Sequence, residues 1–322
     1  MRLKKLYLKG FKSFGRPSLI GFSDRVTAIV GPNGSGKSNI IDAIKWVFGE
    51  QSKKELRASE KFDMIFAGSE NLPPAGSAYV ELVFEENGEE ITVARELKRT
   101  GENTYYLNGS PVRLKDIRDR FAGTGLGVDF YSIVGQGQID RIVNASPEEL
   151  RLESSKHPTS LVPRGSYQRV NESFNRFISL LFFGGEGRLN IVSEAKSILD
   201  AGFEISIRKP GRRDQKLSLL SGGEKALVGL ALLFALMEIK PSPFYVLDEV
   251  DSPLDDYNAE RFKRLLKENS KHTQFIVITH NKIVMEAADL LHGVTMVNGV
   301  SAIVPVEVEK ILEVGSHHHH HH

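Results

Sequence analysis

The sequence predicts an α/β fold with a mixed central sheet and an antiparallel β subdomain. A buried strand, 26–30, runs into a glycine-rich segment and then into an amphipathic helix over 39–48. Two more apolar runs, 243–247 and 275–278, end in polar residues, as buried parallel strands do. Residues 78–112 alternate apolar and polar side chains between turn residues, which is typical of antiparallel hairpins.

The composition excludes several classes of protein. A chain of 322 residues holds one large or two modest domains, and its net charge of +1 gives no bulk attraction to nucleic acid or membrane. The absence of cysteine excludes disulfides, thiolate metal sites and a cysteine nucleophile, and it fits a cytosolic protein. We find neither an apolar run long enough to span a bilayer nor a signal pattern, so we expect no membrane association.

Two segments have the character of laboratory additions. Residues 154–166 contain Leu161-Val-Pro-Arg-Gly-Ser166, a protease cleavage sequence familiar from expression vectors, and residues 315–322 are a purification tag. We interpret 154–166 as an engineered linker that joins two natural segments, 1–153 and 167–314. These segments were then not adjacent in the parent protein.

The segment Gly31-Pro-Asn-Gly-Ser-Gly-Lys37-Ser38 between the first buried strand and its helix has the pattern of a phosphate-binding P-loop. Its glycines let backbone amides close around an anion, and the helix N-terminus adds partial positive charge. The pattern places Lys37 on the β- and γ-phosphates and the Ser38 hydroxyl on Mg²⁺. The residues expected to bind the nucleotide are Pro32, Asn33, Gly34, Ser35, Gly36, Lys37, Ser38 and Asn39.

The first segment begins with residues 3–9, which we interpret as an edge strand with one wet face. A modest basic edge there makes a candidate DNA contact, although a solvated strand face explains the same lysines, which are Lys4, Lys5, Lys9 and Lys12. Arg57 lies in a polar stretch and is, on composition alone, a surface arginine.

An antiparallel meander follows. Strands over 78–84 and 91–97 flank the tight turn at Asn87-Gly88, and a second hairpin turns at Asn108-Gly109 and ends at Val112. A short helix is expected over 114–121.

The next apolar run, from Phe130 to Val134, leads into Gln136 between two glycines. Gln136 is either a Mg²⁺ ligand that also positions water or a residue of a plain polar loop. Ser146-Pro147 is a helix start that the linker soon interrupts.

The second segment opens with Tyr167, Val170, Phe174 and Phe177 at heptad spacing. They form either a coiled-coil seam or the buried face of a packed helix. After strands over 188–192 and 203–208, Ser221 and Glu224 form a capping box at the start of an apolar helix that runs to Met237. Gly222 and Gly223 beside that helix start make either a second anion site or a cap alone.

The strand over 243–247 ends in paired acids, where ligands bind in open α/β sheets. Asp248 is expected to hold Mg²⁺ through water, and Glu249 to polarise the attacking water. A turn to Asp255 and an exposed helix over 256–270 follow, and then a strand ending at His280, which serves either structure or the same site. Closing strands are expected over 291–297 and 301–308.

These motifs occur in the order found in ABC-type ATPases. In detail they resemble the head domain of an SMC (structural maintenance of chromosomes) protein of prokaryotic type, with the coiled coil and hinge removed. The resemblance covers nearly all natural residues and rests on Phe11-Lys-Ser-Phe14, Pro32-Asn33-Gly-Ser-Gly, Val134-Gly-Gln-Gly-Gln-Ile139, Leu220-Ser-Gly-Gly-Glu-Lys225, Val246-Leu-Asp248-Glu249 and Thr279-His280-Asn281. It implies an ABC-type P-loop ATPase head with coiled-coil stubs.

The resemblance also assigns roles. Walker B ends at Asp248, with catalytic Glu249, Q-loop residue Gln136 and switch residue His280. Arg57 becomes the R-loop arginine, which contacts the nucleotide and couples DNA to hydrolysis. The signature motif, which acts on ATP held by a second head, is Ser221, Gly222, Gly223 and Glu224. Asp255 belongs to the D-loop, where Ser252-Pro253 departs from the commoner small residues.

The implied cofactors are ATP and Mg²⁺. The implied partners are a second head, non-specifically bound double-stranded DNA and a kleisin subunit, for a cytoplasmic protein associated with the chromosome. The alternatives are the head of a DNA-break repair or RecN/RecF-type ATPase, an ABC transporter nucleotide-binding domain, and a non-hydrolysing ATP-gated clamp. A metabolite kinase fits least, because it needs no Ser-Gly-Gly signature.

Overall fold

The structure is a computed structural model that describes residues 1–49, 60–124, 126, 132–144, 165–191, 203–239 and 242–306. Its chain forms two compact units, which we describe separately. Unit 1 comprises Met1–Ile133, Ser242–Leu247 and Ser270–His322, and unit 2 comprises Val134–Pro241 and Asp248–Asn269. Each of the two natural segments expected from the sequence therefore contributes to both units.

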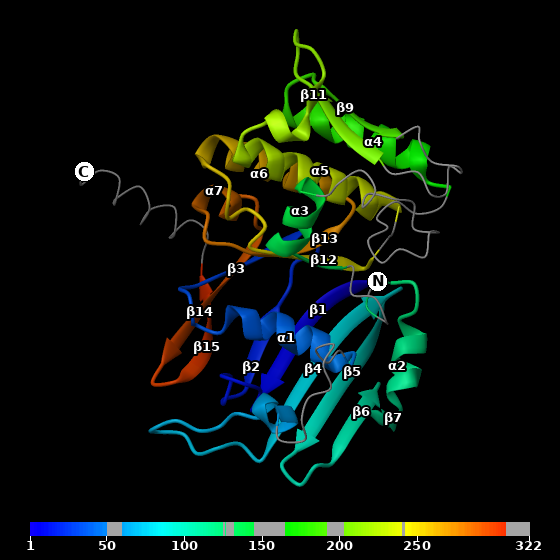
Figure 1. The fold of residues 1–322 in the computed structure, drawn as a ribbon. Helices are drawn as coiled ribbons and strands as arrows, with labels where there is room; N and C mark the ends of the chain where they lie inside the picture. Colours follow the sequence, from blue (N-terminus) through cyan, green and yellow to red (C-terminus); the bar gives the residue numbers. More distant parts are fainter. Residues whose placement is uncertain are drawn as a thin grey trace, which may run out of the picture. The chain divides into compact units, whose positions relative to one another are not determined.

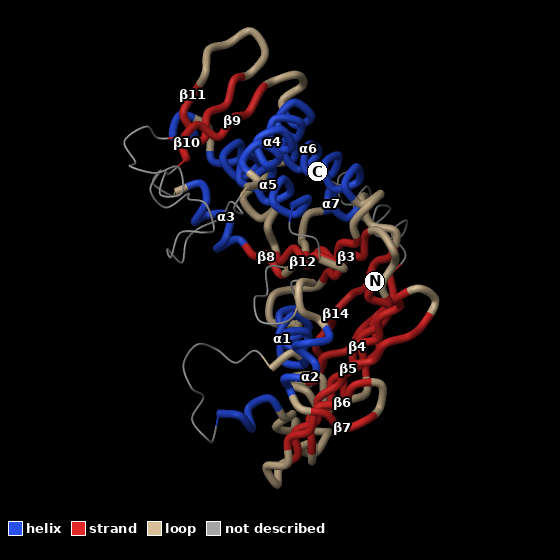
Figure 2. Tube along the Cα trace, turned by 90° about the vertical axis from the view of Figure 1, so that its right-hand side faces the viewer, coloured by secondary structure: helices blue, strands red, loops and turns tan. Residues whose placement is uncertain are grey.

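A six-stranded antiparallel sheet forms one layer of unit 1, with strand order β2-β1-β4-β5-β6-β7 (Figures 1 and 2). Its strands are β1 (Arg2–Lys9), β2 (Ser18–Gly21), β4 (Ser77–Glu86), β5 (Glu89–Lys98), β6 (Asn103–Leu107) and β7 (Ser110–Val112). The two expected hairpins are confirmed, because Asn87-Gly88 and Asn108-Gly109 all have positive φ, as type I′ turns require. The expected edge position of β1 is wrong, because β1 pairs with both β4 and β2.

A second sheet has the order β15-β14-β3-β13-β12-β8. Its strands are β3 (Val26–Val30), β8 (Ile133–Gly135), β12 (Phe244–Asp248), β13 (Gln274–Ile278), β14 (Leu290–Val297) and β15 (Val300–Val306), and β8 leaves unit 1 after Ile133. Strand β3 lies between β13 and β14 and is parallel to both, whereas β15 returns antiparallel to β14. All five residues of β3 are buried, as a continuous apolar run predicts.

Helix α1 (Lys37–Val47) packs on the antiparallel sheet through β4 and β5 (Figure 1). Its buried face, which includes Ile40 and Ile44, belongs to one core cluster with side chains of β1, β4, β12 and β13. The buried guanidinium of Arg95 on β5 donates to the Trp46 carbonyl at the end of α1 and lies 4.4 Å from the Trp46 ring. This cation satisfies a terminal carbonyl and complements the helix dipole, so it ties α1 to the sheet. Burial lowers the pKa of Arg95.

Short elements complete unit 1. They are the 3₁₀ turn η1 (Glu60–Met64), α2 (Leu114–Arg120) and α7 (Lys282–Met285). The Asn281 side chain caps α7 by accepting from the backbone N–H groups of Ile283 and Val284.

Unit 2 is built mainly of helices. They are α3 (Gln136–Val143), α4 (Tyr167–Leu181), α5 (Gly222–Ile239) and α6 (Asp256–Asn269), together with the 3₁₀ turn η2 (Leu217–Leu219). Helix α5 is apolar all round and contacts α3, α4 and α6. The sheet β11-β10-β9 packs on α4 through β9, and its strands are β9 (Glu186–Ile191), β10 (Phe203–Arg208) and β11 (Gln215–Lys216).

Two expectations for the helices of unit 2 can be compared with this packing. The seam residues Val170, Phe174 and Phe177 are buried on α4, which packs on α5 and β9. Helix α6 is amphipathic rather than exposed throughout, since Phe262, Leu265 and Leu266 are fully buried. The expected helix start at Ser146 and most of the 154–166 linker lie outside the described residues. No helix in the described part of the chain has the length and apolar character needed to cross a membrane.

Candidate nucleotide-binding site

The P-loop of unit 1 has the backbone conformation that its glycines allow. Gly34 and Gly36 have φ values of 80° and 110°, in the left-handed region that other residues rarely adopt. A Cβ on Gly36 would also lie 2.4 Å from the Ser301 hydroxyl. Position 36 therefore requires glycine for both its conformation and its surroundings.

A relay of polar side chains holds this loop from behind. The Ser301 hydroxyl on β15 donates to the Ser35 carbonyl at 2.6 Å and lies 2.7 Å from the Ser13 hydroxyl. The Asn39 side chain on α1 donates to Ser13 at 2.8 Å. We call Ser13, Ser35, Asn39 and Ser301 the serine relay. It connects the turn after β1, the P-loop, α1 and a strand nearly 300 residues further along the chain.

Lys37 is the first residue of α1 and is only 6% exposed. Its Nζ lies 2.7 Å from His280 Nε2 and 3.3 Å from Nδ1. Because an ammonium has no lone pair, the nearer imidazole nitrogen accepts. His280 follows β13, the neighbour of β3, and the structure brings its ring to the lysine of the P-loop.

The residues of the loop fit a phosphate chain. Helix α1 has no side-chain cap and no acidic residue in its first turn, so its dipole is not already compensated there. The Ser35 hydroxyl is buried and has no hydrogen-bond partner among the described residues. A bound phosphate oxygen would satisfy that hydroxyl and the terminal amides together.

Mg²⁺ fits this chemistry as well. The described residues contain no group of three or more His, Asp and Glu side chains arranged to hold a metal. Mg²⁺, however, is usually held by one or two carboxylates together with substrate phosphates and water. The exposed Ser38 hydroxyl, at the start of α1, is available for such a shared site.

The paired acids lie in unit 2. Asp248 ends β12, and Glu249 follows with φ of 52°, a left-handed conformation that is uncommon for a residue with a side chain. Such strain concentrates at functional positions, where the surrounding structure holds it in place. The turn after Glu249 is closed by hydrogen bonds from Ser252 N to the Glu249 carbonyl and from Leu254 N to that of Asp251, which confirms the turn expected before Asp255.

Gln136 is the first residue of α3 rather than part of a loop. Its Nε2 donates to Asp140 at 2.9 Å, while its buried Oε1 has no partner among the described residues. Gly135, just before it, lies beside the Asp248 carbonyl, because a Cβ added at Gly135 would be 4.0 Å from that oxygen. The last residues of β8 and β12, Gly135 and Asp248, are therefore neighbours within unit 2, and Gln136 directly follows Gly135.

The capping box at α5 is confirmed. Ser221 Oγ lies 3.3 Å from the Glu224 backbone nitrogen and 3.2 Å from its carboxylate. Burial raises the pKa of Glu224, but the ion pair with Lys209 at 2.8 Å and the hydrogen bonds with Ser221 outweigh it, so the pKa is lowered overall.

The two signature glycines differ in their surroundings. A Cβ at Gly223 would lie 2.6 Å from Asn258 Nδ2, whereas a Cβ at Gly222 would meet no described atom within 4 Å. The Asn258 backbone in turn donates to the Asp255 side chain at 2.8 Å. Asn258 therefore lies between Gly223 of the predicted signature motif and Asp255 of the predicted D-loop inside unit 2.

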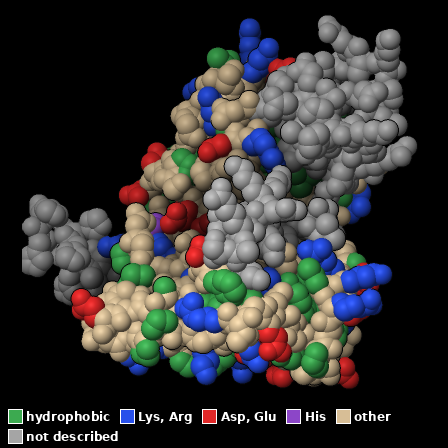
Figure 3. Space-filling view, turned by 60° about the horizontal axis from the view of Figure 1, so that its bottom comes forward, with side chains coloured by type: hydrophobic (Ala, Val, Ile, Leu, Met, Phe, Trp, Pro, Cys, Tyr) green, Lys and Arg blue, Asp and Glu red, His purple; other side chains and the backbone are tan. Residues whose placement is uncertain are grey.

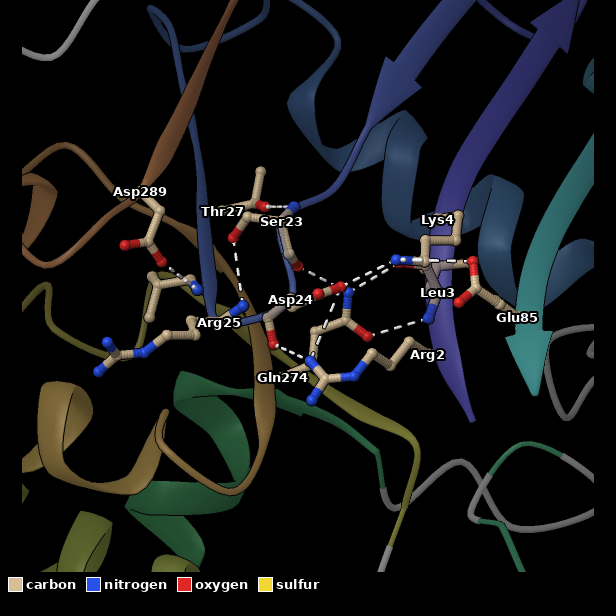
Figure 4. A network of polar contacts seen from close by, with 11 residues as sticks. Arg2, Leu3, Lys4, Ser23, Asp24, Arg25, Thr27, Glu85, Gln274 and Asp289 are labelled. Carbon is tan, nitrogen blue, oxygen red and sulfur yellow. Dashed lines mark hydrogen bonds and ion pairs between the residues drawn. The ribbon is translucent and has the colours of Figure 1, made fainter. Parts of the chain in front are cut away.

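The candidate DNA lysines fall into two pairs. Lys4 forms an ion pair with Asp24 at 3.0 Å and contacts Glu85 (Figure 4), and Lys12 pairs with Asp42 at 2.6 Å. Lys5 and Lys9 are exposed on β1. On the face drawn in Figure 3, the basic side chains of the described residues are scattered among acidic and apolar ones and form no continuous patch.

The structure groups the predicted residues by unit. Residues 32–39 and His280 lie together in unit 1, whereas Gln136, residues 221–224, Asp248, Glu249 and Asp255 belong to unit 2. Arg57 lies outside the described residues. Sequence reasoning missed Ser301, which only the long-range pairing of β15 brings to the loop, and it used Ser13 only as part of a motif.

A P-loop whose buried lysine lies beside a histidine, on a mixed sheet with an antiparallel layer, has the architecture of an ABC-type P-loop ATPase head. The family model described as RecF/RecN/SMC N terminal domain matches residues 2–302, and the chain belongs to this family.

Solved structures confirm the expected fold. The SMC head domain from Thermotoga maritima is 85% identical, with 96% of this chain and 100% of that chain covered and a TM-score of 0.80. An SMC head bound to the C-winged helix domain of ScpA is 38% identical, with 97% and 100% covered and a TM-score of 0.82. The chain therefore has the SMC head fold.

Longer proteins that are similar in sequence to this chain are also SMC proteins. The chromosome partition protein Smc of Halothermothrix orenii is 52% identical over 158 residues, which are 47% of this chain and 13% of that protein. The Smc protein of Fusobacterium nucleatum is 37% identical over 230 residues, 69% of this chain and 19% of that protein. The chain thus spans less than a fifth of the length of these curated relatives.

Proposed function

We propose that the chain is the ATP-binding and ATP-hydrolysing head of a chromosome-organising complex. The observation that carries nucleotide binding is the buried Lys37 at the uncapped, acid-free start of α1, paired with His280. Residues 32–39 would surround the phosphates, with backbone amides and Lys37 compensating their charge. When Lys37 turns to the phosphates, His280 is released to contact the terminal one.

Hydrolysis would depend on residues near the end of β12 and the start of α3. Glu249 would accept the proton of the attacking water, and the strained backbone at that residue would direct its carboxylate. Ser38, Asp248 and Gln136 would hold Mg²⁺, which neutralises charge on the phosphate oxygens. Arg57 would contact the nucleotide and make turnover sensitive to DNA.

A second head would complete the site. Gly222 is exposed at the start of α5, has an ordinary φ, and has open space where a Cβ would be, so nothing in the described chain requires glycine there. A close approach by another molecule explains that glycine. The signature residues 221–224 and Asp255 of one head would then act on ATP bound by its partner, and closure would exclude bulk water.

The wider role is proposed by relationship. Smc relatives bear the name chromosome partition protein, and one similar head structure is bound to the C-winged helix domain of ScpA. We accordingly assign this head a kleisin-type partner, non-specific contact with double-stranded DNA and a place on the chromosome in the cytoplasm. ATP-driven engagement and hydrolysis-driven release of the heads would be coupled to chromosome condensation and segregation.

Two substitutions test this function. Glu249→Gln keeps the shape of the side chain but removes the base, so it should bind ATP, form a dimer on size exclusion and release no phosphate. Ser221→Arg should bind ATP as a monomer. A Glu249→Gln protein that stays monomeric with ATP, or a Ser221→Arg protein with normal turnover, contradicts the two-headed site. Phosphate release by the unaltered protein separates it from a non-hydrolysing clamp.

A further inference from the structure

A cluster of arginine and aromatic side chains in unit 2 has no part in the proposed ATP site. It lies where the end of α4 meets α6, two helices that contact each other (Figure 1). We call it the arginine–aromatic cluster. Its members are Phe182, Phe183, Tyr257, Arg261 and Arg264.

Arg261 is the centre of the cluster and is 9% exposed. Its guanidinium carbon lies 4.2 Å from the ring centroid of Tyr257, 5.1 Å from that of Phe182 and 5.5 Å from that of Phe183. One terminal nitrogen donates to the Tyr257 hydroxyl at 2.6 Å. The other terminal nitrogen and Nε are buried without any hydrogen-bond partner among the described residues. A buried cation with two unused donors is costly unless an acceptor reaches it.

The aromatic side chains above this cation are unusually exposed. Phe183 is 57% and Tyr257 62% exposed, although the neighbouring Phe182 is 4% exposed. Arg264 adds a second cation, 5.2 Å from the Phe183 ring. Exposed aromatic side chains beside arginine are the composition that protein interfaces favour.

The exposed Phe183 has a strained backbone conformation. Helix α4 ends with a hydrogen bond from Gly184 N to the Ser179 carbonyl, and Phe183 has φ of 52° at the position where helices usually have glycine. A bulky residue in this conformation is strained. Position 183 holds phenylalanine, although glycine would have the same conformation without strain. The exposed ring is therefore present despite a conformational cost.

We propose that the arginine–aromatic cluster is a docking surface for an acidic, apolar segment of a protein partner. A carboxylate of that segment reaches the unused donors of Arg261 when the exposed Phe183 ring turns aside, and Arg264 adds a second favourable charge. The faces of Phe183 and Tyr257 bind the apolar side chains beside the carboxylate. Helix α6 carries three carboxylates, Asp256, Glu260 and Glu268, among its four cations, and this mixture suits a single acidic side chain better than a nucleic-acid backbone.

The test uses the full chain and a displayed library of random 12-residue peptides. Selection on the protein should enrich peptides with Asp or Glu next to aromatic or aliphatic residues. Selected peptides should lose about tenfold in affinity when their acid becomes Gln, and as much on the Phe183→Gly or Arg264→Glu protein, as measured by fluorescence anisotropy. A peptide with Lys in place of its acid should recover part of its affinity for the Arg264→Glu protein. The control protein is Leu19→Ala, since Leu19 is also 57% exposed but lies on β2.

The same variants separate docking from a purely structural role. Phe183→Gly should raise the melting temperature, because it relieves the left-handed strain, while it lowers the affinity for the peptides about tenfold. A lower melting temperature would mean that the ring only shields Arg261 and would overturn the proposal. So would the absence of acidic enrichment, equal binding to Phe183→Gly, or displacement of the peptides by single-stranded oligothymidine, which would indicate a nucleic-acid surface.

Discussion

The two glycines of the signature motif predict opposite effects of the same substitution. Both begin α5 and both change from glycine to alanine, so the change in intrinsic helix propensity is the same in kind for both. At Gly223 the new Cβ would lie 2.6 Å from Asn258 Nδ2, closer than real Cβ contacts come. At Gly222 it would lie in open space.

The magnitudes follow from these surroundings. Overpacking a filled site costs about 1–3 kcal/mol, and Asn258 cannot move freely, because it is 5% exposed and its backbone donates to Asp255. At either position, the higher helix propensity of alanine relative to glycine stabilises the fold by up to about 1 kcal/mol. We therefore expect Gly223→Ala to lower the free energy of unfolding by about 1–2 kcal/mol. Gly222→Ala should leave it unchanged or raise it by less than about 1 kcal/mol.

Thermal and urea unfolding measure the stability difference, and size exclusion with ATP measures function. Both proteins should carry Glu249→Gln, so that hydrolysis does not dissolve the dimer. We expect both alanine variants to bind ATP and Gly222→Ala not to dimerise, because its methyl group would stand in the open space where the partner's phosphate approaches. Equal stability of the two variants would refute the packing argument. Normal dimerisation of Gly222→Ala would refute the role assigned to its open space.

Three further outcomes are expected. Ser301→Ala removes the hydrogen bond to the Ser35 carbonyl and should weaken ATP binding by roughly threefold to tenfold, about 1 kcal/mol; isothermal titration should show it, with Ser18→Ala, on exposed-edge β2, as a control, and unchanged affinity would mean that the serine relay does not position the loop. Because the pKa of Glu224 is lowered in the folded state, its ionised form stabilises the fold above the unfolded pKa of 4.5, and this stabilisation is lost as the pH falls through the lower, folded pKa. Glu224→Gln should therefore be less stable than the unaltered protein at pH 7 and equal to it at low pH in urea titrations. Lys5→Gln with Lys9→Gln should reduce DNA affinity and the salt dependence of binding more than Lys4→Gln, whose lysine already pairs with Asp24; equal effects would argue against contact by the exposed pair.

The sequence was most informative where local pattern and local structure coincide. Val26–Val30 forms a fully buried strand because all of its residues but Thr27 are apolar, and Asn87-Gly88 turns because such residues accept positive φ at both positions. Ser221 and Glu224 cap α5 because their spacing satisfies the terminal amides from within one helical turn. In each case the determining contacts lie within a few residues.

It was least informative where contacts come from distant parts of the chain. Strand β1 was expected at an edge because its wet face is basic, but the four-residue β2 covers it, and Gln274 binds the backbone of Leu3 from 271 residues away (Figure 4). The sequence does not distinguish Ser301 from other serines that follow a turn. Only the pairing of β15 with β14 brings Ser301 to the P-loop. A plain polar loop was one of the two alternatives left open for Gln136, yet α3 starts there.

The position of β3 in its sheet bears on the proposed join between the segments 1–153 and 167–314. Strand β3 comes from the first segment, and its neighbours on both sides, β13 and β14, come from the second. Neither segment has a complete sheet without the other, since the first lacks both partners of its most buried strand and the second has a gap in the middle of its sheet. Cutting the chain between residues 154 and 166 would thus leave two polypeptides whose strands alternate within one sheet. Their association would be maintained by strand pairing and a shared core, and covalent continuity would matter for assembly rather than for cohesion.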